Sequence, residues 1–347
     1  MTRVLHIIPD DGIGGVELAA RFAARRHHGL VRLLFLDGEP TDPVDQLEHA
    51  VYAGGRPGGL ATALFALREA RRMRPDVIVF SLWKTWLAFL LIRLFGPRAR
   101  LVVFLHLAES RHVIDAIVTG LNRRLAHAVW ADSLQTLRSR IGAAAESPRA
   151  RAISFVLHKP EGRIRRRPAP HFIYWGRIKH QKRIDRTVRL IASLGETHPD
   201  AELTLIGPDG GRLNDVKRLA EELGVADRVH FLGPRTFDEI EVLAGPASFF
   251  VQLSDFEGMA MASVEAMQLG LVPVVTPVGE VARYCRHGEN AIVYIGHDQA
   301  VRDIDALLRD PPAFERLSEA AIAQWRDAPM YDEDFMAAAD ALARGKA

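Results

Sequence analysis

Short hydrophobic runs alternate along the first half of the chain with longer segments in which apolar residues recur every three or four positions. The runs predict buried strands and the longer segments predict amphipathic helices. Strands are expected at 4–8, 31–36, 76–82, 100–107 and 128–133, with helices at 15–28, 59–75 and 85–96. Because strand and helix alternate, this half predicts a parallel sheet wrapped by helices.

The second half repeats this alternation. Strands are expected at 171–176, 201–207, 228–233, 247–253 and 272–277, and helical patterns at 186–199, 213–224 and 264–270. The proline-rich, basic segment 154–171 between the halves is typical of a linker. We therefore predict an α/β fold with two Rossmann-like, doubly wound parallel-sheet domains, at 1–165 and 166–328, and a detached helix after Trp325.

Length and composition agree with two hydrophobic cores. The chain has 347 residues, of which 48% are hydrophobic and 25% charged. This length exceeds what a single compact core usually holds. Its single cysteine, Cys285, excludes an intramolecular disulfide and suits a reducing compartment. The first apolar run precedes Pro9 and predicts a strand instead of a signal peptide. The segment 85–96 is broken by Arg93 and too short to cross a bilayer, so we expect a cytoplasmic protein, soluble or peripheral to a membrane.

The basic residues are unevenly distributed, although the formal net charge is only +2. The segment 111–167 holds twelve Lys or Arg residues against four Asp or Glu and ends in GRIRRRP. One interpretation is peripheral contact with anionic lipid at the inner face of the membrane. The other is a solvated surface followed by a charged linker. We expect no nucleic-acid partner.

Glycine-rich turns follow several predicted strands, at the edge where open α/β sheets bind ligands. DDGIGGVE (10–17) joins the first strand to the first helix, so Gly14 and Gly15 allow the backbone to approach a ligand at a helix N-terminus. A dinucleotide fingerprint in this register needs glycine at the position of Glu17, which disfavours a dehydrogenase. Tight packing of the turn is the alternative interpretation.

Two basic residues follow the strand at 171–176. WGRIKHQKRID (175–185) places Arg177 and Lys182 on the turn into the next helix. An arginine fork and a lysine point charge held together suit a diphosphate. The alternative is a pair of exposed residues in a basic loop.

Two glutamates flank the turn after the strand at 247–253. In SDFEGMAMASVEAMQLG (254–270), Glu257 lies at the strand end, Gly258 permits a turn and a helix is expected from about Met259. Glu265 falls about two turns into that helix. A carboxylate can accept hydrogen bonds from adjacent sugar hydroxyls, so one glutamate could hold a ribose and the other a hexose. The alternative is an acid that favours the helix dipole and a second on the helix surface.

Together, these residues resemble the retaining nucleotide-sugar glycosyltransferases with two Rossmann domains (the GT-B type), in particular family 4, also termed glycosyl transferases group 1. The resemblance is carried by GGVE, GRIKHQKRID, LTLIGPDGGRL, LAEELGVADRVHFLG, SDFEGMAMASVEAMQLG and VPVVTPVGE. These segments occur in that family's order and spacing. The resemblance covers essentially the whole chain and is strongest from 171 to 295.

The resemblance implies how the donor is held. Arg177 and Lys182 would bind its diphosphate. Glu265 would hold the nucleotide ribose, and Glu257 would contact the transferred sugar. Backbone N–H groups would meet the sugar and phosphate at Gly258, Met259, Ala260 and Met261.

It also implies roles for residues outside this stretch. Gly14 and Gly15 would approach the phosphate or the acceptor from the first domain, while Gly233 and Pro234 would lie near the base. His106 matches a family histidine near the reacting sugar, and a strand-end histidine bonded to backbone is the alternative. The two domains would face a cleft, and residues 329–347 would form a helix that crosses back to the first domain.

The sequence departs from the family pattern at several positions. Arg183 stands where glycine usually follows Lys182, Glu280 replaces the second glycine of the T-x-V-G-G turn, and Arg283 replaces an acid. SLWK (81–84) replaces a histidine-rich strand end, and HKP (158–160) replaces Asn-Gly.

The resemblance implies a retaining, metal-independent hexosyltransferase without a cofactor. The donor would be a nucleoside-diphosphate sugar and the acceptor a glycan, glycolipid or polysaccharide precursor in cell-surface synthesis. Retention would follow from front-face attack, with the leaving diphosphate taking the acceptor's proton. The alternatives are a non-catalytic binding subunit of the same fold and a nucleotide-sugar epimerase of similar architecture.

Overall fold

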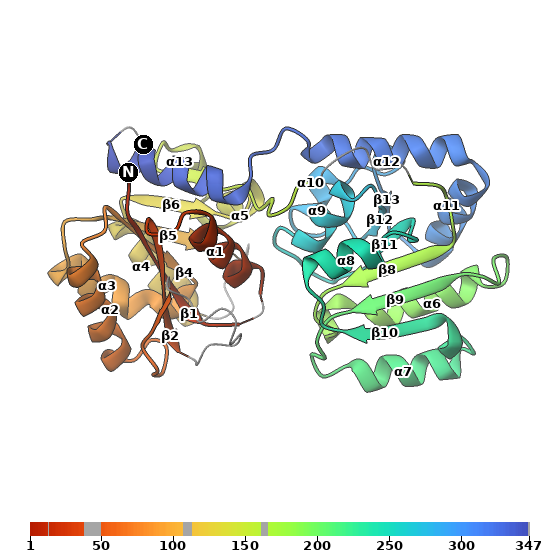
Figure 1. The fold of residues 1–347 in the computed structure, drawn as a ribbon, viewed down its shortest axis with the longest axis horizontal. Coiled ribbons are helices and arrows are strands. Elements are labelled where there is room, and N and C mark those ends of the chain that lie inside the picture. Colours follow the sequence, from red (N-terminus) through yellow and green to blue (C-terminus); the bar gives the residue numbers. More distant parts are fainter. Residues whose placement is uncertain (13, 38–49, 107–112, 161–165, 346–347) are drawn as a thin grey trace. The chain divides into compact units, whose positions relative to one another are not determined.

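The chain forms two compact units in a computed structural model that describes residues 1–12, 14–37, 50–106, 113–160 and 166–345. Unit 1 is Met1–Leu157 with Pro329–Ala347, and unit 2 is His158–Ala328. Each unit is a parallel sheet flanked by helices, which confirms the predicted fold class (Figure 1).

Unit 1 is built on a seven-stranded parallel sheet in the order β3-β2-β1-β4-β5-β6-β7. Its strands are β1 (Val4–Asp10), β2 (Val31–Asp37), β3 (Ala50–Tyr52), β4 (Val77–Ser81), β5 (Arg100–Leu105), β6 (Ala128–Ala131) and β7 (Ala150–Ala152). The hydrophobic pattern predicts all of these except β3 and β7. Those two lie at the edges of the sheet, span three residues each and are only partly buried, so they carry no hydrophobic run.

The helices of unit 1 are α1 (Gly15–Arg26), α2 (Leu60–Met73), α3 (Trp86–Phe95), α4 (Val113–Leu125), α5 (Leu134–Ile141) and α13 (Tyr331–Ala343). Helix α13 comes from the end of the chain. Its Phe335 is fully buried and stacks on His6 of β1 with ring centroids 5.6 Å apart, and the Tyr331 N–H donates to the Val156 carbonyl at 2.8 Å. The final helix therefore packs on the first sheet, as predicted.

Unit 2 contains a six-stranded parallel sheet in the order β10-β9-β8-β11-β12-β13. Its strands are β8 (His171–Trp175), β9 (Glu202–Ile206), β10 (Val229–Gly233), β11 (Phe249–Gln252), β12 (Val272–Val275) and β13 (Ile292–Val293). The helices around it are α6 (Ile184–Leu194), α7 (Leu213–Glu222), α8 (Phe237–Leu243), α9 (Met261–Gln268), α10 (Val281–Tyr284), α11 (His297–Arg309) and α12 (Pro311–Trp325).

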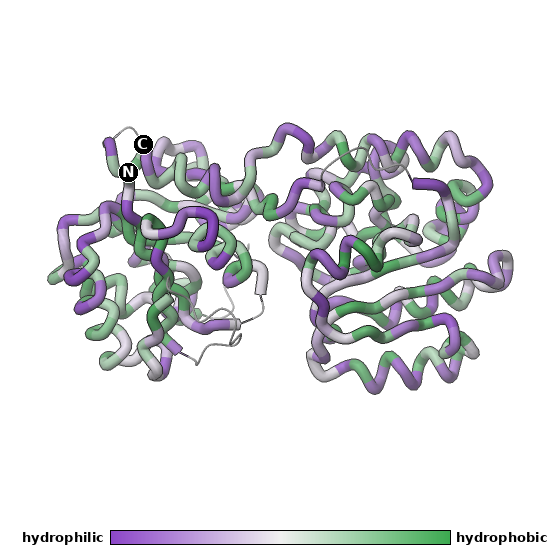
Figure 2. Tube along the Cα trace, in the orientation of Figure 1, coloured by the Kyte–Doolittle hydropathy of each residue, from purple (hydrophilic) through white to green (hydrophobic). Residues whose placement is uncertain are grey.

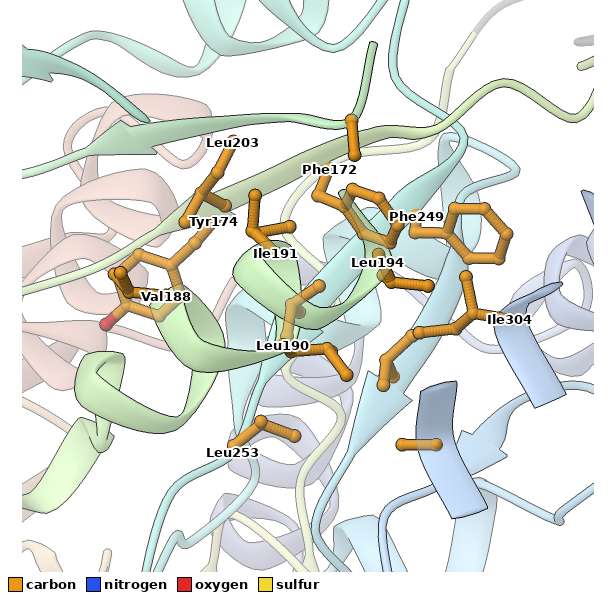
Figure 3. Close-up of a cluster of buried hydrophobic side chains, with 14 of the residues drawn as sticks. Phe172, Tyr174, Val188, Leu190, Ile191, Leu194, Leu203, Phe249, Leu253 and Ile304 are labelled. Carbon is orange, nitrogen blue, oxygen red and sulfur yellow. The ribbon is translucent and has the colours of Figure 1, made fainter. Parts of the chain in front are cut away.

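Both faces of the second sheet are hydrophobic because helices cover each of them. Successive residues of a strand point to opposite faces, so Phe172 and Tyr174 pack with Leu190 of α6 (Figure 3). Ile173 and Trp175 belong to a second cluster that includes residues of α8 and α9. Burial on both faces is typical of a doubly wound sheet. In Figure 2 hydrophilic and hydrophobic colours alternate along α7, as expected for a helix with one face on the sheet.

The predicted linker packs on unit 2. His158 stacks on Phe237 with ring centroids 3.7 Å apart. The Arg166 guanidinium donates to the Ala244, Ala247 and Leu269 carbonyls, each at 2.6 Å. The boundary between the units therefore falls at 157/158, before the expected boundary at 165/166. Part of the GRIRRRP run, residues 162–165, lies outside the described residues.

No helix in the described parts of the chain is both long enough and apolar enough to cross a membrane.

Candidate functional site

The candidate site of unit 2 lies where its strand order reverses. From β8 the chain runs outward to β9 and β10, and it then returns to place β11 on the other side of β8. Ligands of open α/β sheets bind beyond the carboxyl ends of the strands at such a switch point. Arg177 and Lys182 follow β8 and Glu257 follows β11, so the fold brings both predicted segments to this edge.

Lys182 and Glu257 form an ion pair with 2.6 Å between Nζ and Oε1. Their side chains are only 17% and 8% exposed, respectively. The Gln252 amide, at the end of β11, donates to the same glutamate oxygen at 2.8 Å. A phosphate that binds Lys182 would therefore compete with Glu257, while a bound sugar hydroxyl could replace the lysine as donor to that carboxylate.

Arg177 is exposed on a loop whose backbone is held by β9. The Gly176 N–H donates to the Ile206 carbonyl at 2.9 Å, and the Gly210 N–H donates to the Ile178 carbonyl at 2.8 Å. Gly207, at φ +139°, lies against the Gly176 carbonyl, where a Cβ would clash. The GPDGG loop after β9 thus fixes the backbone that carries Arg177.

Helix α9 begins at Met261, not near Met259 as the sequence pattern predicts. Ala260 is in the left-handed region at φ +55°, so the residues before it do not continue the helix. The buried Tyr284 hydroxyl donates to the Met259 carbonyl at 2.9 Å and holds this turn in place. The Ser263 N–H donates to the Ala260 carbonyl at 2.9 Å, whereas the N–H groups of Met261 and Ala262 have no acceptor within the helix and can meet an anion.

Glu265 accepts a hydrogen bond from the Trp175 indole Nε1–H at 2.8 Å. This hydrogen bond orients the Glu265 side chain, which is predicted to bind the ribose, at the carboxyl end of β8. Desolvation raises the pKa of its carboxyl to about 7, although the Trp175 hydrogen bond acts in the opposite direction. The group therefore changes charge near neutral pH.

Three of the departures from the family pattern, at Arg183, Glu280 and Arg283, have structural counterparts. Arg183 has φ +49°, which explains why glycine suits this position, and its guanidinium bonds both oxygens of Asp185, at 3.0 and 2.9 Å. Glu280 has ordinary helical dihedral angles, so this turn does not require a second glycine. Its carboxylate pairs with Arg283 at 3.4 Å, so the two substitutions form a pair.

In unit 1 the strand order reverses between β1 and β4. Gly14 caps α1, of which Gly15 is the first residue, and the preceding loop is held by a buried ion pair between Asp11 and Arg21. Across the switch point, Lys84 Nζ lies 3.6 Å from Asp10 Oδ2. Ion pairs therefore hold this glycine-containing loop in place.

His106 ends β5 and belongs to a buried chain of hydrogen bonds. Its Nε2 lies 2.9 Å from Ser81 Oγ, which lies 2.7 Å from His6 Nε2. Burial lowers the pKa of both histidines to about 3, so both rings are neutral near pH 7. A hydroxyl has one proton to donate, so Ser81 donates to one ring and accepts from the other, which requires opposite tautomers of His6 and His106.

Gly233 ends β10 and Pro234 follows it. Strand β9 lies between β10 and β8. Gly233 has φ +69° and its carbonyl accepts from the Gly207 N–H at 2.9 Å. These two residues lie at the same edge of the sheet as Lys182 and Glu257 but beyond the adjacent strand. The structure thus separates the predicted base region from the predicted diphosphate region.

Part of the chain, mostly within unit 2, is similar to known glycosyltransferases. Residues 161–324 match the family model described as Glycosyl transferases group 1. The chain is 28% identical over 167 residues to uncharacterized glycosyltransferase YqgM of Bacillus subtilis (strain 168), which covers 47% of this chain and 46% of that protein. It is 30% identical over 129 residues to GDP-mannose:cellobiosyl-diphosphopolyprenol alpha-mannosyltransferase of Komagataeibacter xylinus, covering 37% and 33%. The matches span less than half the length of these curated relatives.

Solved structures match almost the whole chain. Anabaena Alr3699/HepE, solved in complex with UDP and glucose, superimposes with a TM-score of 0.81 over 99% of this chain and 100% of that one, at 17% identity. Sucrose-phosphate synthase (tll1590) from Thermosynechococcus elongatus gives 0.76 over 98% of each chain, at 16% identity. The architecture of the chain is therefore GT-B.

In this GT-B chain several site residues escape prediction from the sequence. Gln252, Trp175 and Tyr284 each bond directly to a predicted site residue. They lie in a buried strand or under a turn, where their sequence pattern indicates only core. A polar residue at the last position of a hydrophobic strand, as at Gln252, is the one signal that could have singled out such a residue.

Two Asp-x-Asp pairs occur in the sequence, at 303–305 and 332–334. Asp305 pairs with His198 at 2.9 Å, and Asp332 pairs with His27 at 3.0 Å. Within the described ranges, no three His, Cys, Asp or Glu side chains are grouped in a way that could hold a metal ion.

Proposed function

We propose that this chain is a glycosyltransferase that moves a sugar from a nucleoside-diphosphate sugar to a glycan, glycolipid or polysaccharide-precursor acceptor with retention of configuration. The observation that carries the proposal is the paired Lys182 and Glu257 at the switch point of unit 2, beside the N-terminus of α9, in the segment that matches group 1 glycosyl transferases. The UDP and glucose of the Anabaena structure make a UDP-sugar the first donor to test.

The proposed roles follow from the chemistry of each group. Arg177, Lys182 and the first N–H groups of α9 would stabilise the charge that develops on the departing diphosphate, so no metal or other cofactor is required. Once Lys182 turns to phosphate, Glu257 would accept hydrogen bonds from the transferred sugar. Glu265 would accept them from the ribose.

In the proposed reaction the bond between the sugar C1 and the diphosphate oxygen breaks while the acceptor oxygen bonds to C1 on the same face. The acceptor's proton passes to the leaving diphosphate. His106 would contribute as a neutral hydrogen-bonding group, because burial keeps its pKa at about 3. The Asp10 and Lys84 pair of unit 1 suits a polar, hydroxyl-rich acceptor.

Calorimetric titration with UDP, GDP, ADP and TDP tests the donor site. One nucleotide should bind selectively, and Arg177→Ala, Lys182→Met and Glu265→Ala should each weaken it by about tenfold or more. Glu257→Gln should not weaken it, because the substitution removes the carboxylate that competes for Lys182. Arg218→Ala, on the exposed surface of α7, is the matched control.

The products of the reaction distinguish the remaining alternatives. With the matching sugar donor, NMR of the product gives its anomeric configuration and so tests retention. An inverted product would refute retention but not sugar transfer. Conversion of the donor sugar without an acceptor would support an epimerase. A folded protein that binds none of the four nucleotides would contradict the proposed donor site and favour a non-catalytic subunit.

A further inference from the structure

Helix α4 is oriented with polar residues inward and apolar residues outward. Its buried positions are Asp115, Thr119 and Asn122. In contrast, Val113 is 73%, Ile117 64% and Leu121 43% exposed. A helix that covers a sheet in water normally has the opposite arrangement.

The inward face of α4 is held by a polar network, which fixes this orientation. The Thr119 hydroxyl donates to Asp115 Oδ1 at 2.9 Å, and the Arg140 guanidinium lies 3.5 Å from the same oxygen. These residues line a small cavity of about 40 Å³ with Trp83 and His106. Turning the helix to hide its apolar residues would break this network and expose the cavity.

The outward face of α4 combines apolar surface with positive charge. Val113, Ile117, Leu121 and Leu125 recur every four residues and therefore form one stripe. Arg124 is also exposed, next to Leu125. The only acidic residue of the helix is Asp115, which faces inward.

The end of α3, which packs beside α4, has the same character. Leu94 is 70% and Phe95 56% exposed, and the neighbouring Arg93 is exposed as well. Helix α3 contains no acidic residue. Two adjacent helices thus present exposed hydrophobic side chains with arginines and without exposed carboxylates.

We propose that the exposed face of α4, with the end of α3, binds the surface of a bilayer that contains anionic lipid. At 13 residues, α4 is about 20 Å long and cannot span a membrane. A helix with an apolar stripe and flanking arginines instead lies in the interface, with its apolar side chains among the acyl chains and its cations at the headgroups.

The rest of the basic 111–167 segment contributes less than its composition indicates. Arg140 pairs with Asp115, Arg149 donates to the His127 carbonyl at 3.1 Å, and Arg166 bonds to backbone carbonyls of unit 2. These arginines are occupied within the protein. We therefore expect the apolar stripe to contribute more to bilayer binding than the basic residues do.

Sedimentation with phosphatidylcholine vesicles, with and without phosphatidylglycerol, tests this surface on the full chain. The wild type should pellet with the anionic vesicles. The double variant Ile117→Glu/Leu121→Glu should lower the partition coefficient by about tenfold or more. Arg124→Gln should weaken binding to anionic vesicles only. Val242→Glu, at a site 77% exposed on α8, is the matched control and should bind like the wild type.

Sedimentation velocity without lipid, together with circular dichroism, completes the test. The wild type should be monomeric, and the double variant should keep the wild-type spectrum because both side chains are exposed. A wild type that ignores anionic vesicles, or a double variant that binds them equally, would overturn the proposal. So would a wild-type dimer that the double variant dissociates, since a second copy would then cover the stripe. The experiment uses no sugar donor, so its failure would not affect the proposed transferase activity.

Discussion

At the scale of single residues, the Glu265 carboxyl should make the stability of the protein depend on pH. Its pKa is raised from 4.5 to about 7 by desolvation. Between these values the folded state holds a proton that the unfolded state releases, so stability should fall as pH rises through this window. Glu265→Gln lacks this titration. Relative to that variant, the free energy of unfolding of the wild type should fall by about 1 to 3 kcal/mol between about pH 5 and about pH 8.

Urea unfolding of both proteins at the two pH values measures this difference. Groups that titrate in both proteins cancel in the comparison. Glu222→Gln, on the exposed end of α7, controls for the substitution itself. A difference between wild type and Glu265→Gln that stays constant with pH would show that the carboxyl is not desolvated by its surroundings.

The residues that bear charge at the site could be found in the sequence, whereas their partners could not. Three of the charged residues, Arg177, Lys182 and Glu257, stand out because they follow predicted strands. Glu265 stands out as a carboxylate within the predicted helix that comes next. Their pairing is invisible there, because Lys182 and Glu257 are 75 positions apart. Only adjacent strands bring them together.

At the scale of elements, the turn before α10 supports the loop before α9. Gly279 has φ +58°, and a Cβ there would clash with the Glu257 carbonyl and lie 2.8 Å from the Gly258 carbonyl. Gly279→Ala should therefore displace the loop that carries Glu257, destabilise the protein by about 1 to 3 kcal/mol and weaken nucleotide binding.

Gly288→Ala is the matched comparison, because Gly288 has φ +71° but nothing lies within 4 Å of a Cβ there. It should lower the free energy of unfolding by only about 1 kcal/mol, through backbone strain, and leave the affinity for nucleotide unchanged. Thermal unfolding and calorimetric titration measure both effects. Equal affinities for the two variants would argue against a supporting role of Gly279.

Element prediction succeeds for the central strands of both sheets and misses the short strands at their edges. The central strands carry continuous hydrophobic runs because helices cover both faces of each sheet. Helix α4 is absent from the predicted helices although its apolar residues recur every four positions, and this pattern does not show that the apolar face is the exposed one. The two-residue strand β13 is too short for any periodicity.

At the scale of the whole molecule, the last helix stabilises the first unit. Phe335 is fully buried and contacts the Trp130 ring with centroids 5.5 Å apart. Phe335→Ala should lower the free energy of unfolding of unit 1 by about 3 to 5 kcal/mol and increase amide hydrogen exchange in its strands. Phe314→Ala, in the core of unit 2, should increase exchange in unit 2 instead. An effect of Phe335→Ala confined to α13 would contradict this dependence.

The sequence by itself determined the two α/β halves, the alternation of strands and helices within them and the charged residues of the candidate site, because hydrophobic periodicity and turn residues are local properties. Tertiary structure alone decided which strands are neighbours, and hence the Lys182–Glu257 pair, the chain from His6 through Ser81 to His106, and the desolvation of Glu265. It also decided which face of α4 is buried. These features depend on contacts between distant segments and on access of water, neither of which is written in the local pattern.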